Sequence, residues 1–326
     1  INMTNFKKVG LTALAASLVS VSAHAGSLSA SGSASMNTEG FSGEQLDAGT
    51  TFSMANSVVL SGSGELDNGM TVSVKFEMDD GASNNTLSAF DDHSVTVSSD
   101  TMGTLVLAGH GGKSSVGAID TTAAGDMWDN FDDLSVGTAT IADAITTNTN
   151  GDDALLYTSP SFAEGLNFTA SYNPQKTNST GSEVGYGVNY SGFEGLTLNY
   201  ATMEIVTGTT STEGDVDVLK ASYAYGPVTA TYSLLDYDVS DTGTAKESTS
   251  YALSYTITDE LSVTYGSEEH ERANTSTDIE IDGISVSYTT GGVTISASSQ
   301  SAENLNFNTG SQYDIDYWAL GASFAF

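Results

Sequence analysis

The chain has 326 residues, and its 41 acidic residues outnumber eight basic ones, giving a net charge of −33. The shortage of Lys and Arg argues against nucleic acid as a partner, because phosphate binding depends on basic clusters. With no cysteine, the chain has neither a disulfide framework nor a thiolate metal site, while 15 Tyr and 12 Phe at strand spacing argue against the disorder that high acidity can accompany.

The first 25 residues have the pattern of a secretory signal peptide. Lys7 and Lys8 precede an uncharged stretch, residues 9–21, and Ala23-His24-Ala25 supplies a small-x-small cleavage site. This stretch is too short to cross a bilayer as a helix, which takes about 20 apolar residues. We therefore expect residues 1–25 to be removed and residues 26–326 to form the mature protein.

Strands with period-two alternation begin directly after this segment. The ranges 28–36, 51–64, 71–79, 94–99 and 104–110 alternate apolar and polar residues. Asn68-Gly69 between two such runs is a strong hairpin signal. The phase of the third range places Lys75 and Glu77 side by side on its polar face.

The alternation then stops for about forty residues, from 111 to 153. This stretch holds eight Asp against one Lys, among them Asp126, Asp129, Asp132 and Asp133. A loop this long inside a compact unit is usually functional. Trp128 and Phe131 within it predict that the loop is ordered and packs on another part of the chain.

From residue 154 onward, strands alternate with connections of two different lengths. The expected strands are 154–159, 166–172, 183–190, 196–205, 215–225, 228–238, 248–257, 261–270, 278–288, 293–302 and a last one that alternates from Tyr313. The strand at 278–288 changes phase near Gly283, which suggests a bulge. Seven short turns alternate with longer polar stretches, which are residues 37–49, 81–92, 111–153, 173–182, 206–213, 239–246, 271–277 and 303–311.

The count predicts an all-β fold, a transmembrane antiparallel β-barrel of sixteen strands with short periplasmic turns and long external loops. An even number of strands allows closure, which removes the edges that lipid would not tolerate. The last strand supports this, since a set of large apolar residues shares one face and ends the chain on an aromatic residue: Trp318, Leu320, Phe324 and Phe326. A soluble β-sandwich or β-helix with a buried aromatic core is the alternative fold.

Three local motifs resemble the sixteen-stranded general porins of Gram-negative bacteria, especially the alphaproteobacterial type. They are Asn68-Gly69-Met70 leading to Val74-Lys75-Phe76-Glu77, the hairpin of residues 99–107, and Tyr157-Thr158-Ser159-Pro160 continuing to Gly165. The terminal aromatic strand resembles the insertion signal of outer-membrane barrels. The resemblance implies a homotrimer among outer-membrane lipid and lipopolysaccharide, with residues 111–153 folded into the lumen as a constriction.

The sequence departs from this family in its basic residues. Similar porins set an acidic constriction loop against a basic cluster on the barrel wall, but Ala154-Leu155-Leu156 stands where an Arg is common. By phase, Lys75 and Lys220 are the lumen-facing positive charges that we identify. The acids that face them are Glu77, Asp79, Glu183, Glu268 and those of the loop. Since a pore lined by one sign of charge concentrates counter-ions, we expect a preference for cations.

No combination of residues indicates catalysis or a cofactor. Gly112-Lys113-Ser114 lacks the preceding Gly of a phosphate-binding loop, and among the many acids no carboxylate pair, such as Asp132-Asp133, stands out as a candidate for acid–base work. The acids around His270 are typical of a solvated strand end, although calcium on the acidic loops stays open. The sequence thus predicts a porin for passive diffusion of small hydrophilic solutes and ions rather than an enzyme. The alternative is an exported acidic surface protein or adhesin with calcium-binding loops.

Overall fold

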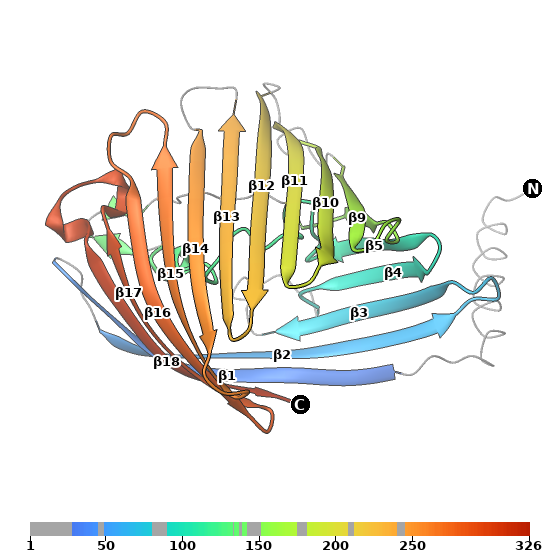
Figure 1. Ribbon diagram of the computed structural model, residues 1–326, viewed down its shortest axis with the longest axis horizontal. Coiled ribbons are helices and arrows are strands. Elements are labelled where there is room, and N and C mark those ends of the chain that lie inside the picture. Colours follow the sequence, from blue (N-terminus) through green and yellow to red (C-terminus); the bar gives the residue numbers. More distant parts are fainter. Residues whose placement is uncertain are drawn as a thin grey trace, which may run out of the picture.

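The computed structural model describes residues 28–44, 49–79, 90–132, 134–136, 139–141, 151–174, 181–207, 212–239 and 245–326. The signal peptide predicted for residues 1–25 lies outside them. Sixteen antiparallel strands form a closed barrel in the order β1-β18-β17-β16-β15-β14-β13-β12-β11-β10-β9-β8-β5-β4-β3-β2 (Figure 1). None of the helices in these residues is long and apolar enough to cross a membrane.

The barrel strands follow the order of the sequence. The first eight are β1 (Leu28–Gly43), β2 (Thr50–Glu65), β3 (Thr71–Asp79), β4 (His93–Ser99), β5 (Gly103–His110), β8 (Ala154–Thr158), β9 (Leu166–Asn173) and β10 (Glu183–Phe193). The other eight are β11 (Leu196–Thr207), β12 (Thr212–Tyr225), β13 (Val228–Val239), β14 (Lys246–Thr256), β15 (Leu261–Arg272), β16 (Ile279–Thr290), β17 (Val293–Glu303) and β18 (Ile315–Ala325). The prediction of sixteen strands is confirmed.

The first and last strands close the barrel. β1 pairs with β18 from Ser33↔Ala325 to Gly43↔Ile315, and with β2 along its other edge. Phe326 extends this seam, because its N–H and C=O both bond to the backbone of Gly32, at 3.0 and 2.9 Å. The alternative fold, a β-sandwich or a β-helix, is therefore wrong.

Two predicted boundaries at this seam are also wrong. β1 continues to Gly43, whereas residues 37–49 were expected to form a loop, and β18 begins at Ile315, after a 3-10 turn at Ser311–Tyr313. Most side chains of residues 37–43 are polar, and for that reason the sequence did not indicate a strand there. The structure satisfies one of them within the sheet, since Glu39 accepts hydrogen bonds from Tyr317 Oη at 3.0 Å and Thr51 Oγ1 at 3.3 Å.

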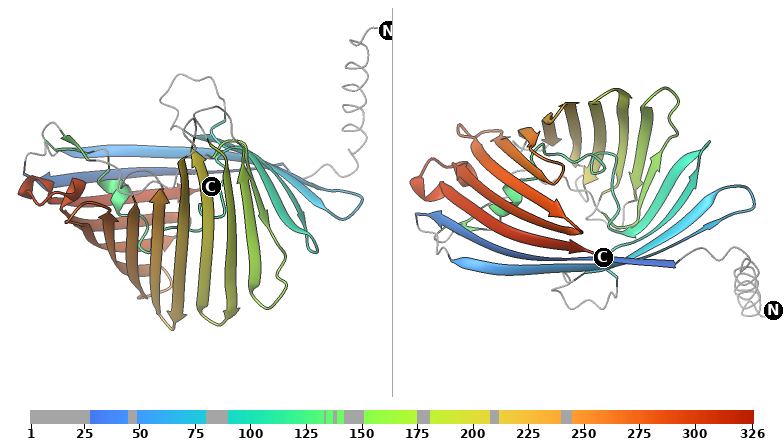
Figure 2. Two further views of the ribbon diagram at one scale, coloured as in Figure 1. Left: turned by 90° about the horizontal axis from the view of Figure 1, so that it is seen from above. Right: turned by 60° about the horizontal axis from the view of Figure 1, so that its bottom comes forward.

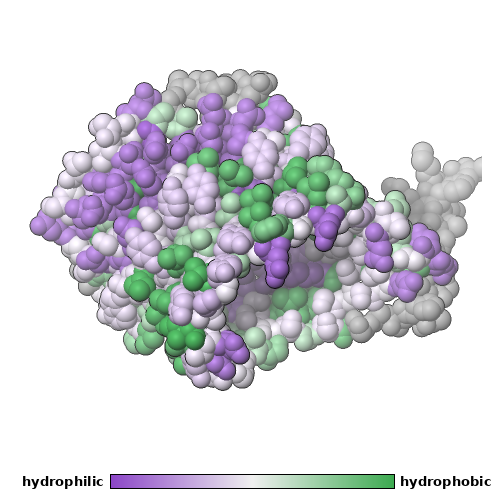
Figure 3. Space-filling view, in the orientation of Figure 1, coloured by the Kyte–Doolittle hydropathy of each residue, from purple (hydrophilic) through white to green (hydrophobic). Residues whose placement is uncertain are grey.

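The outer face of the barrel carries exposed large apolar side chains. The most exposed fractions on the barrel strands include 82% for Phe52, 61% for Tyr186 and 53% for Leu253. Figure 3 shows one face of the molecule, which is hollowed at its centre, with hydrophobic groups bordering the hollow. A surface of this kind suits lipid, whereas a water-soluble protein rarely exposes contiguous apolar area of this extent.

Along β16, the apolar residues change from the inner face, near the long loops, to the outer face further along the strand. On β16, Ile279 and Ile281 are fully buried on the inner face, whereas Ile284, Val286 and Tyr288 lie exposed on the outer face. The pairing of β16 with β15 and β17 has no register shift, so the bulge predicted near Gly283 is wrong. The phase changes on β16 because its half nearer the long loops packs inward against the inner loop, whereas its other half presents apolar groups on the outer face.

Candidate functional site

In the long loop between β5 and β8, residues 111–153 and hereafter the inner loop, the residues that the structure describes run along the inside of the barrel. β5 and β8 pair directly, so no part of the loop is needed to bridge them. The loop meets three strands in turn: Ser115 N–H donates to Ser171 Oγ of β9 at 2.8 Å, Ser233 Oγ of β13 donates to Thr121 O at 2.7 Å, and Ala123 N–H donates to Ser250 Oγ of β14 at 2.8 Å. Figure 2 shows this segment inside the curve of the sheet.

Apolar side chains hold the far end of the inner loop. Trp128, in the 3-10 turn η2 (Trp128–Asn130), is 6% exposed and Phe131 is fully buried. They pack in a cluster with residues of β16 to β18 that includes Ile279, Ile281 and Ile315. The short strands β6 (Ser135–Val136) and β7 (Ala139–Thr140) follow. The prediction that Trp128 and Phe131 pack on another part of the chain is confirmed.

Glycine allows the loop to approach the wall closely. A Cβ added at Gly283 would lie 2.9 Å from Met127 Sδ, and one added at Gly266 would lie 3.3 Å from Met127 Cε. Both distances are shorter than an ordinary contact. The inner faces of β15 and β16 therefore have small residues where the loop crosses them.

Glu268 on β15 is the deepest polar anchor of the loop. Its two carboxylate oxygens accept the N–H groups of Met127 at 3.0 Å and Trp128 at 3.1 Å, at the start of η2. The residue is 1% exposed. A carboxylate at this position satisfies backbone donors that a helical turn leaves free, and its charge suits the amino end of that turn. The sequence placed Glu268 on the lumen face but not in the site.

His270 lies beside this anchor. Its ring is 5.3 Å from that of Trp128, and its Nε2 is 3.7 Å from Glu268 Oε2. Both ring nitrogens are buried without a hydrogen-bond partner among the described residues. The sequence interpretation of His270 as part of a solvated strand end is wrong, because the inner loop covers it.

Lys220 on β12 holds the middle of the loop. Its Nζ donates to Asp120 Oδ2 at 2.6 Å and to Thr122 O at 2.7 Å. Burial raises the pKa of Asp120, but the hydrogen bond from Lys220 and those from Thr122 outweigh it and hold the pKa below its usual range. The predicted lumen lysine therefore lies against the loop, but it neutralises Asp120, which the sequence analysis did not select.

The predicted loop acids differ in their surroundings. Asp126 is half-buried, and its burial, together with repulsion from Asp129 and Glu268, raises its pKa to about 7. Asp129 is exposed, and burial followed by Glu268 raises its pKa too. Neither forms an ion pair with a residue the structure describes. Asp132 is half-buried, and Asp133 lies outside the described residues.

Lys75 and Glu77 lie together, away from these acids. They form an ion pair of 2.6 Å on β3, and Ser57 Oγ donates to Glu77 at 2.9 Å. In the barrel order β3 is separated from β15 by β2, β1, β18, β17 and β16. The structure thus places the predicted constriction residues in two groups, one on and against the inner loop and the other on the barrel wall at β3.

The four residues predicted to guide membrane insertion share the outer face of β18. Their exposed fractions are 44% for Trp318, 49% for Leu320, 43% for Phe324 and 76% for Phe326. Trp318 and Phe326 also cover glycines of β1, since a Cβ at Gly40 or Gly32 would meet their rings. These side chains therefore both face the surroundings and lie over the closing seam.

Three side chains of the types that ligate metals lie together at the loop end of β4 and β5. One ligand atom each from Asp91, Asp92 and His110 lies within 4.8 Å of the others. His110 Nδ1 is 3.2 Å from Asp92 Oδ1, and burial, followed by repulsion from Asp79 and Asp92, raises the pKa of Asp91. Oxygen and imidazole ligands of this kind suit a divalent cation.

The comparisons with known proteins agree with this geometry. The family described as Gram-negative porin matches residues 10–274. The anion-selective porin from Comamonas acidovorans superposes with a TM-score of 0.68 at 14% identity, covering 92% of this chain and 100% of that one. A loop-deletion mutant of OmpT, an outer membrane protein of Vibrio cholerae, gives 0.65 at 15% identity, with 93% and 100% covered.

A mutant of the Rh. blastica porin gives a TM-score of 0.65 at 17% identity, with 92% of this chain and 100% of that chain covered. No curated protein sequence matches the chain. The family match spans most of the sequence, and the barrel has the sixteen strands of the superposed structures. The chain therefore belongs to the Gram-negative porins, outer-membrane channels for passive diffusion.

Proposed function

We propose that this porin is a water-filled channel for small hydrophilic solutes that favours cations. The observation that carries the proposal is the pairing of charges in the lumen. Lys75 and Lys220 each lie 2.6 Å from a carboxylate, whereas Asp126 and Asp129 have no basic partner in the described part of the chain. The residual charge on the inner loop is negative, and it attracts cations.

The test is the reversal potential of reconstituted channels in a potassium chloride gradient. Replacing Asp126, Asp129, Asp132 and Asp133 together by Asn removes the loop charge. We expect the cation-to-anion permeability ratio to fall in dilute salt. The fall is smaller in concentrated salt, because the screening length shrinks from ~10 Å at 0.1 M to ~3 Å at 1 M.

A matched control changes as many charges on the outer face. Asp215, Asp236, Asp238 and Glu280 alternate with inward-facing neighbours on β12, β13 and β16 and point outward. Replacing them by Asn or Gln alters the net charge equally. If the control lowers the ratio as much as the loop variant does, a general surface effect explains the selectivity and the proposal is wrong.

The assembly and its surroundings are part of the same proposal. We expect a homotrimer in the outer membrane, in contact with lipid and lipopolysaccharide, made from residues 26–326 after removal of the signal peptide. Heat-dependent migration on a detergent gel tests the trimer, and the amino-terminal sequence of the purified protein tests the cleavage.

Calcium binding at Asp91, Asp92 and His110 is tested by calorimetric titration of the folded protein, with Asp92→Asn as the variant that should lose binding.

A further inference from the structure

We propose that the barrel wall beneath the root of the inner loop holds a binding site for a small zwitterion with a short aliphatic side chain. The proposal rests on the proposed function, since it concerns a solute inside the channel. It starts from a cavity of about 220 Å³ between the root of the inner loop and the strands β3, β4, β5 and β8. This cavity lies apart from Asp126, Asp129 and Glu268.

The floor of the cavity is a patch of the inner wall. Four neighbouring strands place Lys75, Ser94, Ala108 and Ala154 in one row, because each is the register partner of the next. Val106 and Leu156 form the row beside it. Alternate residues of the same strands, including Phe76, Val95 and Leu107, are exposed on the outer face, so these rows face the lumen. The floor is aliphatic, with a lysine at one side.

The roof is the root of the inner loop. Gly111 has a φ of 68°, and a Cβ there would overlap the carboxylate of Asp92. A Cβ at Gly112 would lie 2.6 Å from that of Ala154 and 2.8 Å from that of Ala108. Gly112 N–H donates to Gly151 O at 2.7 Å, which ties both ends of the loop together. Two glycines therefore let the backbone lie close over the wall and enclose the cavity.

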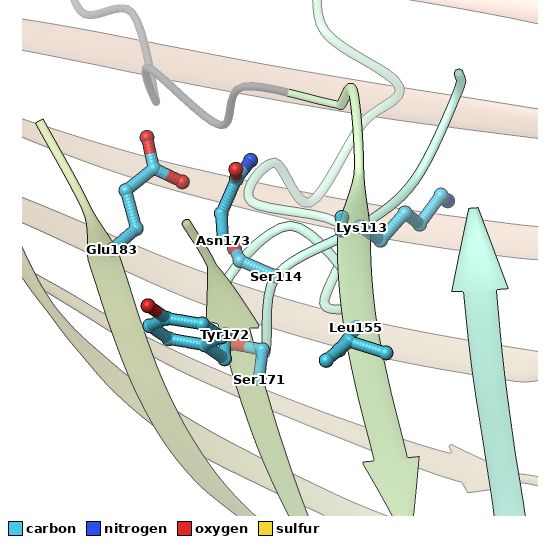
Figure 4. Close-up of a pocket in the computed structure, with 8 residues that line it drawn as sticks. Lys113, Ser114, Leu155, Ser171, Tyr172, Asn173 and Glu183 are labelled. Carbon is cyan, nitrogen blue, oxygen red and sulfur yellow. The ribbon is translucent and has the colours of Figure 1, made fainter. Parts of the chain in front are cut away.

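The cavity gathers positive charge in a chain that has little of it. Only eight of 326 residues are Lys or Arg, yet Lys75 and Lys113 both line this space. Lys75 is paired with Glu77, whereas Lys113 has no ion-pair partner among the described residues. Figure 4 shows the Lys113 side chain directed away from Glu183 and Asn173. Lys113 is thus the ammonium available to a carboxylate.

The mouth of the cavity carries the opposite charge. Asp92 and His110 line it, 3.2 Å apart, and His110 Nε2 is also 3.4 Å from Asp152. A simple anion would meet these carboxylates and the acidic lumen. A zwitterion has a carboxylate for Lys113 and an ammonium for Asp92, and an aliphatic side chain fits the floor of Val106 and Leu156. The charge pattern therefore favours the amino-acid class over simple anions or cations.

The experiment measures block of potassium chloride conductance by L-valine in reconstituted channels, with EDTA present to keep divalent cations off Asp92 and His110. Isovalerate lacks the ammonium of valine, and valinamide lacks its carboxylate. We expect saturable block by valine, at a half-blocking concentration lower than that of either analogue by about tenfold or more, the effect of one charge-assisted hydrogen bond.

Lys113→Gln should raise the half-blocking concentration of valine to that of valinamide. Lys246→Gln, which makes the same charge change at the start of β14, should leave it unchanged. Val106→Phe, which fills the floor without changing charge, should also weaken the block. Heat-dependent migration on a detergent gel shows that each variant is folded, and Val106→Phe provides the test if Lys113→Gln does not assemble.

Three results would overturn the inference: channels that conduct but show no saturable block, equal block by valine and valinamide, or full block in both the Lys113→Gln and the Val106→Phe variants. Each leaves the diffusion channel itself intact. Absence of any conductance would instead refute the proposed function, and the inference with it. The two failures are therefore distinguished by the current measured before valine is added.

Discussion

Replacing Glu268 by Gln should detach the inner loop from the wall for part of the time. The carboxylate accepts two backbone N–H groups, at 3.0 and 3.1 Å, and is almost completely buried. An amide has one oxygen, so one N–H loses its acceptor and faces an NH₂ group. Leaving one buried donor unsatisfied costs about 1–3 kcal/mol. At 1.4 kcal/mol for each factor of ten, the detached state becomes about 5- to 150-fold more populated.

Two measurements test whether the loop detaches more often in Glu268→Gln. Single-channel recordings should show more frequent current fluctuations, and the amides of Met127 and Trp128 should exchange hydrogen faster by the same factor. Glu269→Gln is the matched control, because Glu269 is the next residue on β15 and is exposed on the outer face. If Glu268→Gln keeps the exchange rates and current noise of the control, the carboxylate does not anchor the loop.

Three further predictions concern separate parts of the chain. Because the pKa of Asp126 is about 7, its negative charge is lost as pH falls through 7, so the cation-to-anion permeability ratio in dilute salt should decrease from pH 8 to pH 6 and should change less in Asp126→Asn. Phe326→Ser should abolish trimer assembly while signal cleavage continues, since the residue anchors the closing strand at the membrane interface; normal trimer yield on a gel would refute this. Ile281→Ala should destabilise the packing under the loop by about 2–5 kcal/mol, measured by thermal unfolding, whereas Ile284→Ala on the outer face should have a smaller effect, and equal losses would contradict the assignment of faces.

The strands and their order could be predicted from the sequence because both depend on local signals. Period-two alternation marks each strand, and Gly69 and Gly103, both with positive φ, mark hairpin turns that reverse the chain at once. Alternating short and long connections then permit only neighbouring antiparallel pairs. The failures are equally local. Residues 37–43 are mostly polar but pair with β18. The apolar residues of β16 change from the inner to the outer face at Gly283, without a bulge.

The composition of the inner loop also indicated that part of it would pack against the rest of the chain. Eight Asp in 111–153 predicted a charged segment, and Trp128 and Phe131 predicted that it packs. The sequence could not show which acids keep their charge in the lumen. Asp120 and Asp126 have the same side chain, yet Lys220 lowers the pKa of the first and burial raises that of the second.

Only the tertiary structure decided which residues hold the loop and which remain for solutes. Lys220 reaches Asp120 across 100 positions and Glu268 reaches Met127 across 141, and no periodic pattern relates such pairs. These contacts form because closure of the barrel brings the inner faces of β12 and β15 onto one wall, against which the loop lies. The alternation of residues along each strand specifies which side chains point inward, but closure in three dimensions determines what each of them meets there.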